Sequence, residues 1–304
     1  MASETLREAA ARPLWRRIVD FPLVAMLIGI AIIFLGIAIS GATAKLAMPD
    51  IPGFTGEMKF ALICSPLLII LYKLVIRRLG EHPRDDLRIA GALKPFGTGL
   101  VAGVAIFSVA VAIAAAIGVY RVTGEGDTRE LLAALLTTAI FPAVSEEMLF
   151  RGVLFRWLEE FGGSWAALVL TSALFGAAHL ANPNASAIAA VGIALEAGVM
   201  LGAAYMLTRS LWLPMGLHAA WNFTQGEIFD IPVSGKDVHG LVVARLSGPP
   251  LLTGNGFGLE ASLIAIVVAT LFGFWLLWLA IRRNQLVAPW WVRRRLAREA
   301  AEAA

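Results

Sequence analysis

The chain has 304 residues, of which 59% are hydrophobic and 15% are charged, and its formal net charge at pH 7 is +3. Soluble domains carry about 25% charged residues, so the composition excludes an ordinary soluble enzyme and predicts one polytopic membrane domain over residues 1–304. The basic residues lie beside apolar segments, which is typical of membrane topology signals. We therefore expect the lipid bilayer as a partner and no binding of nucleic acid.

The apolar segments are long enough to cross a bilayer, and they predict an all-α membrane protein with about eight transmembrane helices. The first follows a basic stretch but is longer than the apolar region of a signal peptide, so we expect it to be retained. The Gly- and Pro-rich residues 230–258 are expected to form an extramembrane loop. The predicted spans are residues 21–42, 60–76, 96–120, 131–158, 164–180, 185–207, 211–229 and 259–281.

Eight spans place both chain ends on the same side of the membrane. With both ends in the cytoplasm, Lys and Arg are about three times as frequent in the inner segments as in the outer segments, in agreement with the positive-inside rule. We therefore predict that residues 1–20 and 282–304 are cytoplasmic tails. The expected location is the inner membrane of a bacterium, with the chain crossing it several times.

Two carboxylates and a guanidinium lie inside the fourth predicted span. Each unpaired charge at membrane depth costs about 2.5–3.5 kcal/mol on insertion scales. Glu147 and Arg151 are four residues apart on a helix, the spacing of an ion pair. Glu146 points about 100° away from Glu147 and lacks such a partner by spacing, so we interpret it as the group left free to react. A solvated charged face is the alternative, and the apolar surroundings make it the weaker one.

Further polar residues occur in the fifth and seventh spans. Phe175 and His179 share one helix face, and so do His218 and Asn222. A single histidine in an apolar helix is more often a packing residue than a ligand, but two of them together with an unpaired glutamate indicate a site. Glu146, His179 and His218 form a ligand set that suits zinc. The same residue types also suit a mechanism without metal, in which a glutamate is the general base and a histidine is its partner. The Asn222 amide is a donor suited to an oxyanion.

Three motifs follow one another on these spans: Glu-Glu-x-x-x-Arg at 146–151, Phe-x-x-x-His at 175–179 and His-x-x-x-Asn at 218–222. In this order they resemble the CPBP family of intramembrane proteases, which groups CAAX prenyl endopeptidases with bacteriocin-processing and self-immunity proteins. The resemblance covers residues 131–229, so spans four to seven are the predicted catalytic core. All three motifs are intact.

The resemblance implies a role for each matched residue. Glu146 is expected to activate the attacking water with the help of His179, and His218 and Asn222 are expected to stabilise the oxyanion. The family is usually classed among metalloproteases, so zinc is a possible cofactor. The supporting residues are Glu147, Arg151 and Phe175.

The sequence therefore predicts an intramembrane endopeptidase that cleaves near the C-terminus of a membrane-embedded or lipidated substrate. A prenylated protein or a bacteriocin-like precursor is the expected partner. Two alternatives stay open, a catalytically silent immunity or binding scaffold and a proton-coupled transporter. Loss of a motif residue would favour the scaffold, and an inverted repeat would favour the transporter. The sequence shows neither feature.

Two positions are harder to interpret. Glu196 lies midway along the sixth span, outside the three motifs, and is a secondary candidate that either packs as a neutral acid or reaches Arg151 or a histidine. His179 ends its span on the outer side, whereas Glu146 lies further inside, so we expect a tilt or kink near Pro142 to bring them level.

Overall fold

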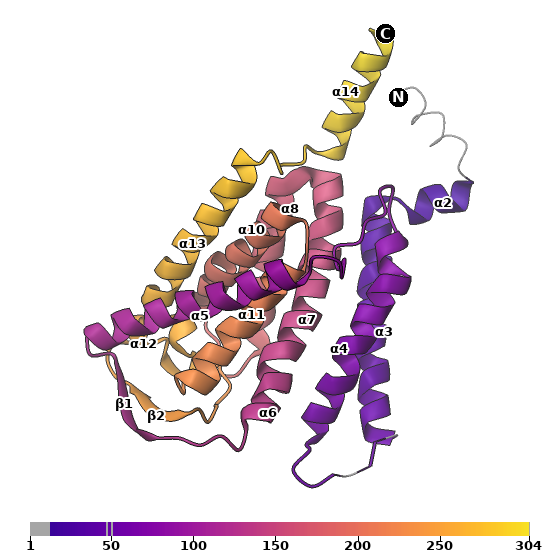
Figure 1. The fold of residues 1–304 in the computed structure, drawn as a ribbon. Coiled ribbons are helices and arrows are strands. Elements are labelled where there is room, and N and C mark those ends of the chain that lie inside the picture. Colours follow the sequence, from indigo (N-terminus) through magenta and orange to yellow (C-terminus); the bar gives the residue numbers. More distant parts are fainter. Residues whose placement is uncertain (1–12, 47, 50, 304) are drawn as a thin grey trace.

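The computed structural model describes residues 13–46, 48–49 and 51–303, so most of the predicted tail 1–20 lies outside the described residues. The described chain is almost entirely helical, which confirms the predicted all-α membrane protein. Figure 1 shows α2 (Leu14–Val19) and α14 (Trp290–Glu302) at one end of the helix bundle, and strands β1 and β2 at the other.

Six helices of the described residues are long and apolar enough to cross a membrane. One of them, Leu131–Ala181, has 51 residues, which is about twice the length that a bilayer requires. Gly163 interrupts it with φ of 83° and ψ of 168°, a conformation open to glycine and the break that the sequence predicts between spans four and five. The seventh predicted segment is also helical but shorter, so the count of eight spans stays a prediction.

The first two spans form a hairpin. Helix α3 (Pro22–Leu46) packs along α4 (Gly56–Leu74), and Thr55 caps α4 by accepting a hydrogen bond from the backbone N–H of Met58. Figure 1 places this hairpin at one side of the bundle, where α3 also contacts α8 (Arg156–Ala178). The hairpin therefore flanks the predicted catalytic core and contributes none of its motif residues.

A charged segment connects the hairpin to the core. Asp85 accepts from Lys73 Nζ at 2.6 Å and from Arg77 Nη1 at 3.2 Å. Partial burial opposes ionisation of Asp85, but these cations and the backbone N–H of Leu87 outweigh it and lower its pKa. The neighbouring Asp86 is buried and accepts a hydrogen bond from the Tyr205 hydroxyl, so the segment fixes the ends of distant helices against each other.

The tightest helix pair is α5 (Leu93–Ala116) with α11 (Trp212–Phe223). A Cβ atom at Gly99 would lie 2.4 Å from the carbonyl oxygen of Leu213, and one at Gly103 would lie 2.5 Å from that of Leu217. Glycine is therefore required at both positions, because small residues allow helix backbones in membranes to approach closely. This contact fixes the depth and rotation of α11, which carries His218 and Asn222.

Four turns in the core are π-helical, and all lie in or beside the predicted spans four, six and seven. A π-turn widens a helix by one residue and occurs frequently at functional sites. Phe141 begins α7 (Phe141–Glu147) directly after the first of them, and Pro142 is the second residue of that helix. A π-turn therefore lies beside this proline, and the expected tilt or kink stays a prediction. The turns are Leu135–Ile140, Met148–Phe155, Ala194–Gly198 and Thr224–Ile228.

The sixth and seventh segments complete the core. Helix α9 (Ala187–Ile193) continues through a π-turn into α10 (Val199–Thr208), and α10 packs against α13 (Leu263–Arg282). Helix α6 (Leu131–Ala134) begins the fourth segment. The core is thus assembled from the broken helix, the α9 and α10 segment, and α11.

The segment after α11 is more structured than the predicted loop. Strand β1 (Tyr120–Glu125) pairs antiparallel with β2 (Val242–Leu246), followed by the short α12 (Pro250–Thr253). The predicted start of the last span at residue 259 is wrong, because α13 begins at Leu263 with Ser262 as its cap. Residues Leu259–Ala261 instead form a buried turn after Gly258, whose φ of 114° excludes helix. This turn directs Glu260 toward the core.

Candidate active site

Glu147 is the centre of the polar cluster. Its side chain is fully buried, and its Oε1 accepts a hydrogen bond from Arg151 Nη1 at 2.9 Å, one helical turn away. This confirms the pair expected from the spacing of the motif. Arg151 is equally buried, so each charge depends on the other for its compensation.

Arg151 also links the motif helix to the sixth segment. Its Nη2 donates to the carbonyl oxygens of Ala197 at 3.1 Å and Gly198 at 3.2 Å, at the end of the π-turn Ala194–Gly198. Its guanidinium lies 4.7 Å from the centre of the Phe175 ring, a cation–π distance. Phe175 therefore supports the site through Arg151, and the two residues connect three helical segments.

A second partner of Glu147 was not foreseen from the sequence. His218 Nδ1 lies 2.9 Å from the same Oε1 atom that accepts from Arg151. A carboxylate oxygen only accepts, so Nδ1 carries the proton and Nε2 faces away from Glu147. Glu147 thus orients the histidine of α11 in addition to pairing with the arginine of its own helix.

Glu146 is the more accessible of the two acids. About a third (32%) of its side-chain surface is exposed, and its Oε2 lies 4.0 Å from His218 Nε2. This separation is too long for a direct hydrogen bond, and Oε2 itself is buried and has no hydrogen-bond partner among the described residues. If His218 is protonated, Glu146, Glu147, Arg151 and His218 form a set with no net charge.

His179 approaches the site from the end of α8. Its Nδ1 lies 2.7 Å from the carbonyl oxygen of Phe175, and its ring centre lies 4.7 Å from that of Phe175. The carbonyl accepts, so Nδ1 is the protonated nitrogen and Nε2 is free to accept. His179 and His218 line one cavity. The histidine close to Glu146 is His218, and not His179 as the resemblance implied.

Asn222 lies one turn beyond His218 on α11. Its side-chain amide donates to the carbonyl oxygen of Thr138 at 2.9 Å, which uses one of its two N–H groups. The residue also lines the cavity. Its second N–H therefore remains available to a ligand there, as an oxyanion donor requires.

A small cavity of about 20 Å³ lies among these side chains, which is enough for one water molecule. It is bounded by α8, the α9 and α10 segment, α11 and the loop that precedes α13. Its polar lining residues are His179, Glu196, His218, Asn222, Ser234 and Glu260.

Sequence reasoning missed Glu260 and Ser234. Glu260 is buried and accepts a hydrogen bond from the backbone N–H of Ser234. Burial raises the pKa of Glu260 to about 7, although hydrogen bonds from Ser234, Gln225 and Trp221 favour its charged form. The signal in the sequence was an acidic residue two positions before the Ser262 cap, but only the folded loop shows that this residue reaches the core.

The donor chemistry of the predicted zinc set suits a metal, since both histidines have Nδ1 occupied and Nε2 free. However, Glu146, His179 and His218 do not place their ligand atoms within 4.8 Å of one another. Zinc ligands lie about 2 Å from the ion, so the three residues do not fit one ion as they stand. We derive no catalytic step through a metal.

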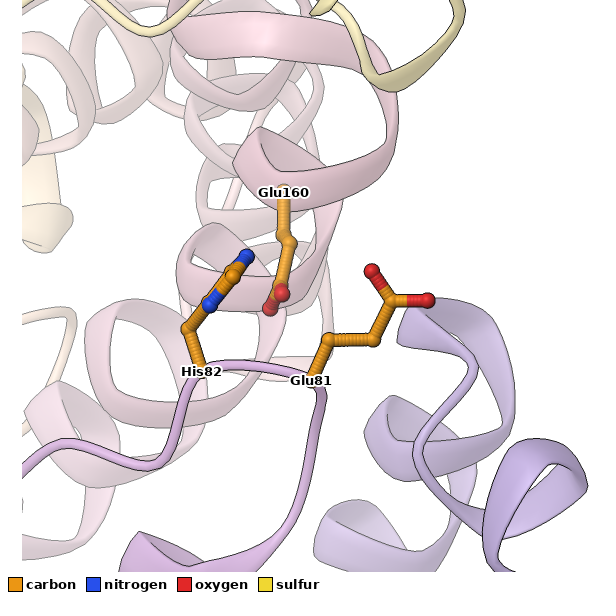
Figure 2. A group of neighbouring side chains, drawn as sticks. All are labelled: Glu81, His82 and Glu160. Carbon is orange, nitrogen blue, oxygen red and sulfur yellow. The ribbon is translucent and has the colours of Figure 1, made fainter. Parts of the chain in front are cut away.

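The described residues do gather three potential ligands elsewhere, namely Glu81, His82 and Glu160 (Figure 2). Figure 2 shows the His82 ring and the Glu160 carboxylate facing each other. Arg294 Nη2 lies 3.7 Å from Glu81, so a guanidinium already compensates part of this acidic charge. The group is separate from the three motifs, and we assign it no ion.

Comparison with known proteins gives one match. Residues 128–224 match the family model described as type II CAAX prenyl endopeptidase Rce1-like, and this region contains all three motifs. The chain matches no curated protein and no solved structure. Residues 128–224, with the three intact motifs, are therefore similar to the CAAX-type proteases of the CPBP family.

Proposed function

We propose that this protein is an intramembrane endopeptidase in which Glu146 activates a water molecule for attack on a peptide bond. The observation that carries the proposal is the division of labour between the adjacent glutamates. Glu147 is engaged by Arg151 and His218, whereas Glu146 is partly exposed and lies 4.0 Å from His218 Nε2. A carboxylate that is accessible, without an ion-pair partner in direct contact, is the group suited to general base catalysis.

In the proposed mechanism, water binds between Glu146 Oε2 and His218 Nε2. Glu146 takes a proton from the water as its oxygen attacks the carbonyl carbon of the substrate. The negative charge that develops on the carbonyl oxygen is stabilised by the N–H groups of His218 and Asn222. Glu147 accepts from His218 Nδ1 and thereby aims the opposite ring nitrogen, whose N–H is present in the imidazolium form, at the developing charge.

His179 has a positioning role in this proposal. Its Nδ1 is held by the carbonyl of Phe175, so Nε2 faces the ligand space as an acceptor. An acceptor there suits a second hydrogen bond to the attacking water or to a substrate N–H. Zinc stays a prediction of the sequence, which the separation of Glu146, His179 and His218 in the structure does not support.

The proposed substrate is the C-terminal part of a membrane-embedded or lipidated protein. An apolar groove of about 670 Å³ lies between α5, the π-turn Leu135–Ile140 and α11. Ala219 and Ala220, between His218 and Asn222 on α11, form part of its wall. The groove shares α11 with His218 and Asn222, although neither of them lines it. It fits an aliphatic chain, which supports a prenylated or otherwise lipidated substrate and also suits a hydrophobic bacteriocin-like precursor.

The proposed orientation has both chain ends in the cytoplasm of a bacterium. The argument rests on the distribution of Lys and Arg, and on α2 and α14 lying at the same end of the bundle. The active-site loop 230–262 then lies toward the opposite side of the membrane.

The decisive experiment compares membrane peptides from cells that produce the wild type or Glu146→Gln. The variant keeps size and removes the base, so peptides that depend on cleavage should vanish, while purified protein should lose activity by about 10²-fold or more. Glu57→Gln, an exposed glutamate in the first turn of α4, is the control and should cleave as the wild type does. Identical peptides from the wild type and Glu146→Gln would refute the protease and favour a silent scaffold.

A further inference from the structure

Glu196 is the least compensated buried charge in the site. Its side chain is 1% exposed, and neither carboxylate oxygen has a hydrogen-bond partner among the described residues. It lines the cavity shared by His179 and His218. A buried polar group without partners is costly and calls for a reason.

The nearby cation does not neutralise Glu196. Arg151 reaches the same π-turn, but its Nη2 donates to the backbone carbonyls of Ala197 and Gly198, and its Nη1 donates to Glu147. These hydrogen bonds hold the π-turn Ala194–Gly198 in place, and the Glu196 carboxyl group lines the cavity. Arg151 thus supports the position of Glu196 without forming a hydrogen bond to its carboxylate.

The other titratable groups that line the cavity are Glu260, His179 and His218. Glu260 lines the same cavity, so a charge on Glu260 opposes a charge on Glu196. An unpaired carboxylate at membrane depth, beside a second acid, has its lowest free energy as the neutral acid. Glu196 therefore offers an O–H group to the cavity, whereas Glu146 offers a carboxylate to the water.

This pairing of an acid with a base matches the needs of peptide hydrolysis. The amine leaving group departs only if it gains a proton, and water supplies that proton overall. Sites that carry out both steps separate a group that is charged from a group that is kept neutral by its surroundings. Glu146 and Glu196 have these two environments, and His218 lies near both, 4.0 Å from Glu146 and in the lining of the cavity that Glu196 also lines.

Building on the proposed endopeptidase function, we propose that Glu196 is a further catalytic residue, the acid that protonates the departing amine. Glu146 takes one proton from water as the C–O bond forms. The C–N bond then breaks as the Glu196 O–H proton passes to nitrogen. The proton on Glu146 returns to Glu196 through water and His218, so both acids end as they began and one water has been consumed.

The test compares an amide substrate with an ester substrate of the same sequence, because an alkoxide leaves without prior protonation far more readily than an amine. Glu196→Gln should lower amide cleavage by about 10²-fold or more, the size of a general acid contribution, and ester cleavage by less than tenfold. Glu146→Gln should remove both activities. Glu57→Gln makes the same change at an exposed position of α4, outside the cavity, and should leave both activities unchanged.

Infrared difference spectra supply a readout that is independent of turnover. The wild type at pH 7 should show C=O bands of protonated carboxyl groups. The component of Glu196 should be missing from Glu196→Gln and should remain in Glu260→Gln, since Glu260 contributes a component of its own. A purely structural role would lower amide and ester cleavage equally and reduce the melting temperature. Two outcomes would each overturn the assignment: equal losses of amide and ester cleavage in Glu196→Gln, or a wild-type spectrum without the C=O band of Glu196. Wild-type protein that cleaves neither substrate would overturn the endopeptidase function as well.

Discussion

Replacement of Glu147 by Gln tests the central contact of the site. Glu147 is fully buried and accepts hydrogen bonds at 2.9 Å from Arg151 Nη1 and His218 Nδ1. Hydrogen bonds to a charged group contribute about 1.5–3 kcal/mol each, and removal of one partner from a buried ion pair costs about 3–5 kcal/mol. We therefore expect the free energy of unfolding to fall by about 3–5 kcal/mol, because Arg151 remains buried without its counter-charge.

Turnover should fall together with stability, because His218 depends on the same carboxylate for its orientation. The double variant Glu147→Met and Arg151→Met separates the two effects. It leaves no buried charge unpaired, so stability should recover in large part. Activity should not recover, since His218 Nδ1 still lacks its acceptor.

The measurements are melting temperature in detergent and turnover of a membrane-embedded peptide. Glu299→Gln is the control, since Glu299 forms an exposed ion pair with Arg295 in α14 and such pairs contribute about 0–1 kcal/mol. Wild-type melting of Glu147→Gln would refute the buried pair. Recovery of activity in the double variant would show that His218 does not need Glu147.

Three further predictions concern other parts of the molecule. Gly103→Ala should destabilise the protein by about 1–3 kcal/mol and lower turnover, because its Cβ would lie 2.5 Å from the carbonyl oxygen of Leu217 on α11. Gly97→Ala is the control: its added Cβ meets nothing within 4 Å, so its melting temperature should equal that of the wild type. The pKa of Asp85 is lowered by its cationic neighbours, so its contribution to stability is present above the pKa of the unfolded state and is lost as the pH falls through the folded value. The melting temperature of Asp85→Asn should therefore fall less on acidification than that of the wild type, and an equal fall would contradict this. If zinc is bound, protein prepared without chelator should contain about one equivalent, lost in His179→Ala, and an active preparation without metal would end that prediction.

The sequence by itself was sufficient for features that depend on local spacing and on the length of apolar segments. The helical period places Glu147 and Arg151 on one face, and the structure has them in contact at 2.9 Å. The break at Gly163 follows equally from local chemistry, because a glycine there adopts a φ of 83°. Apolar length likewise predicts an all-α membrane protein, since only helices satisfy every backbone polar group within one segment.

Tertiary structure alone decided how distant segments meet. Glu147 and His218 are 71 residues apart, and the close packing of α5 on α11 through Gly99 and Gly103 fixes the helix that carries the histidine. The start of α13 at Leu263 leaves Glu260 in a turn that folds into the core beside Glu196. Periodicity describes one helix at a time, whereas these contacts depend on the rotation and depth of several helices, which are set by side-chain packing between segments that the sequence does not place side by side.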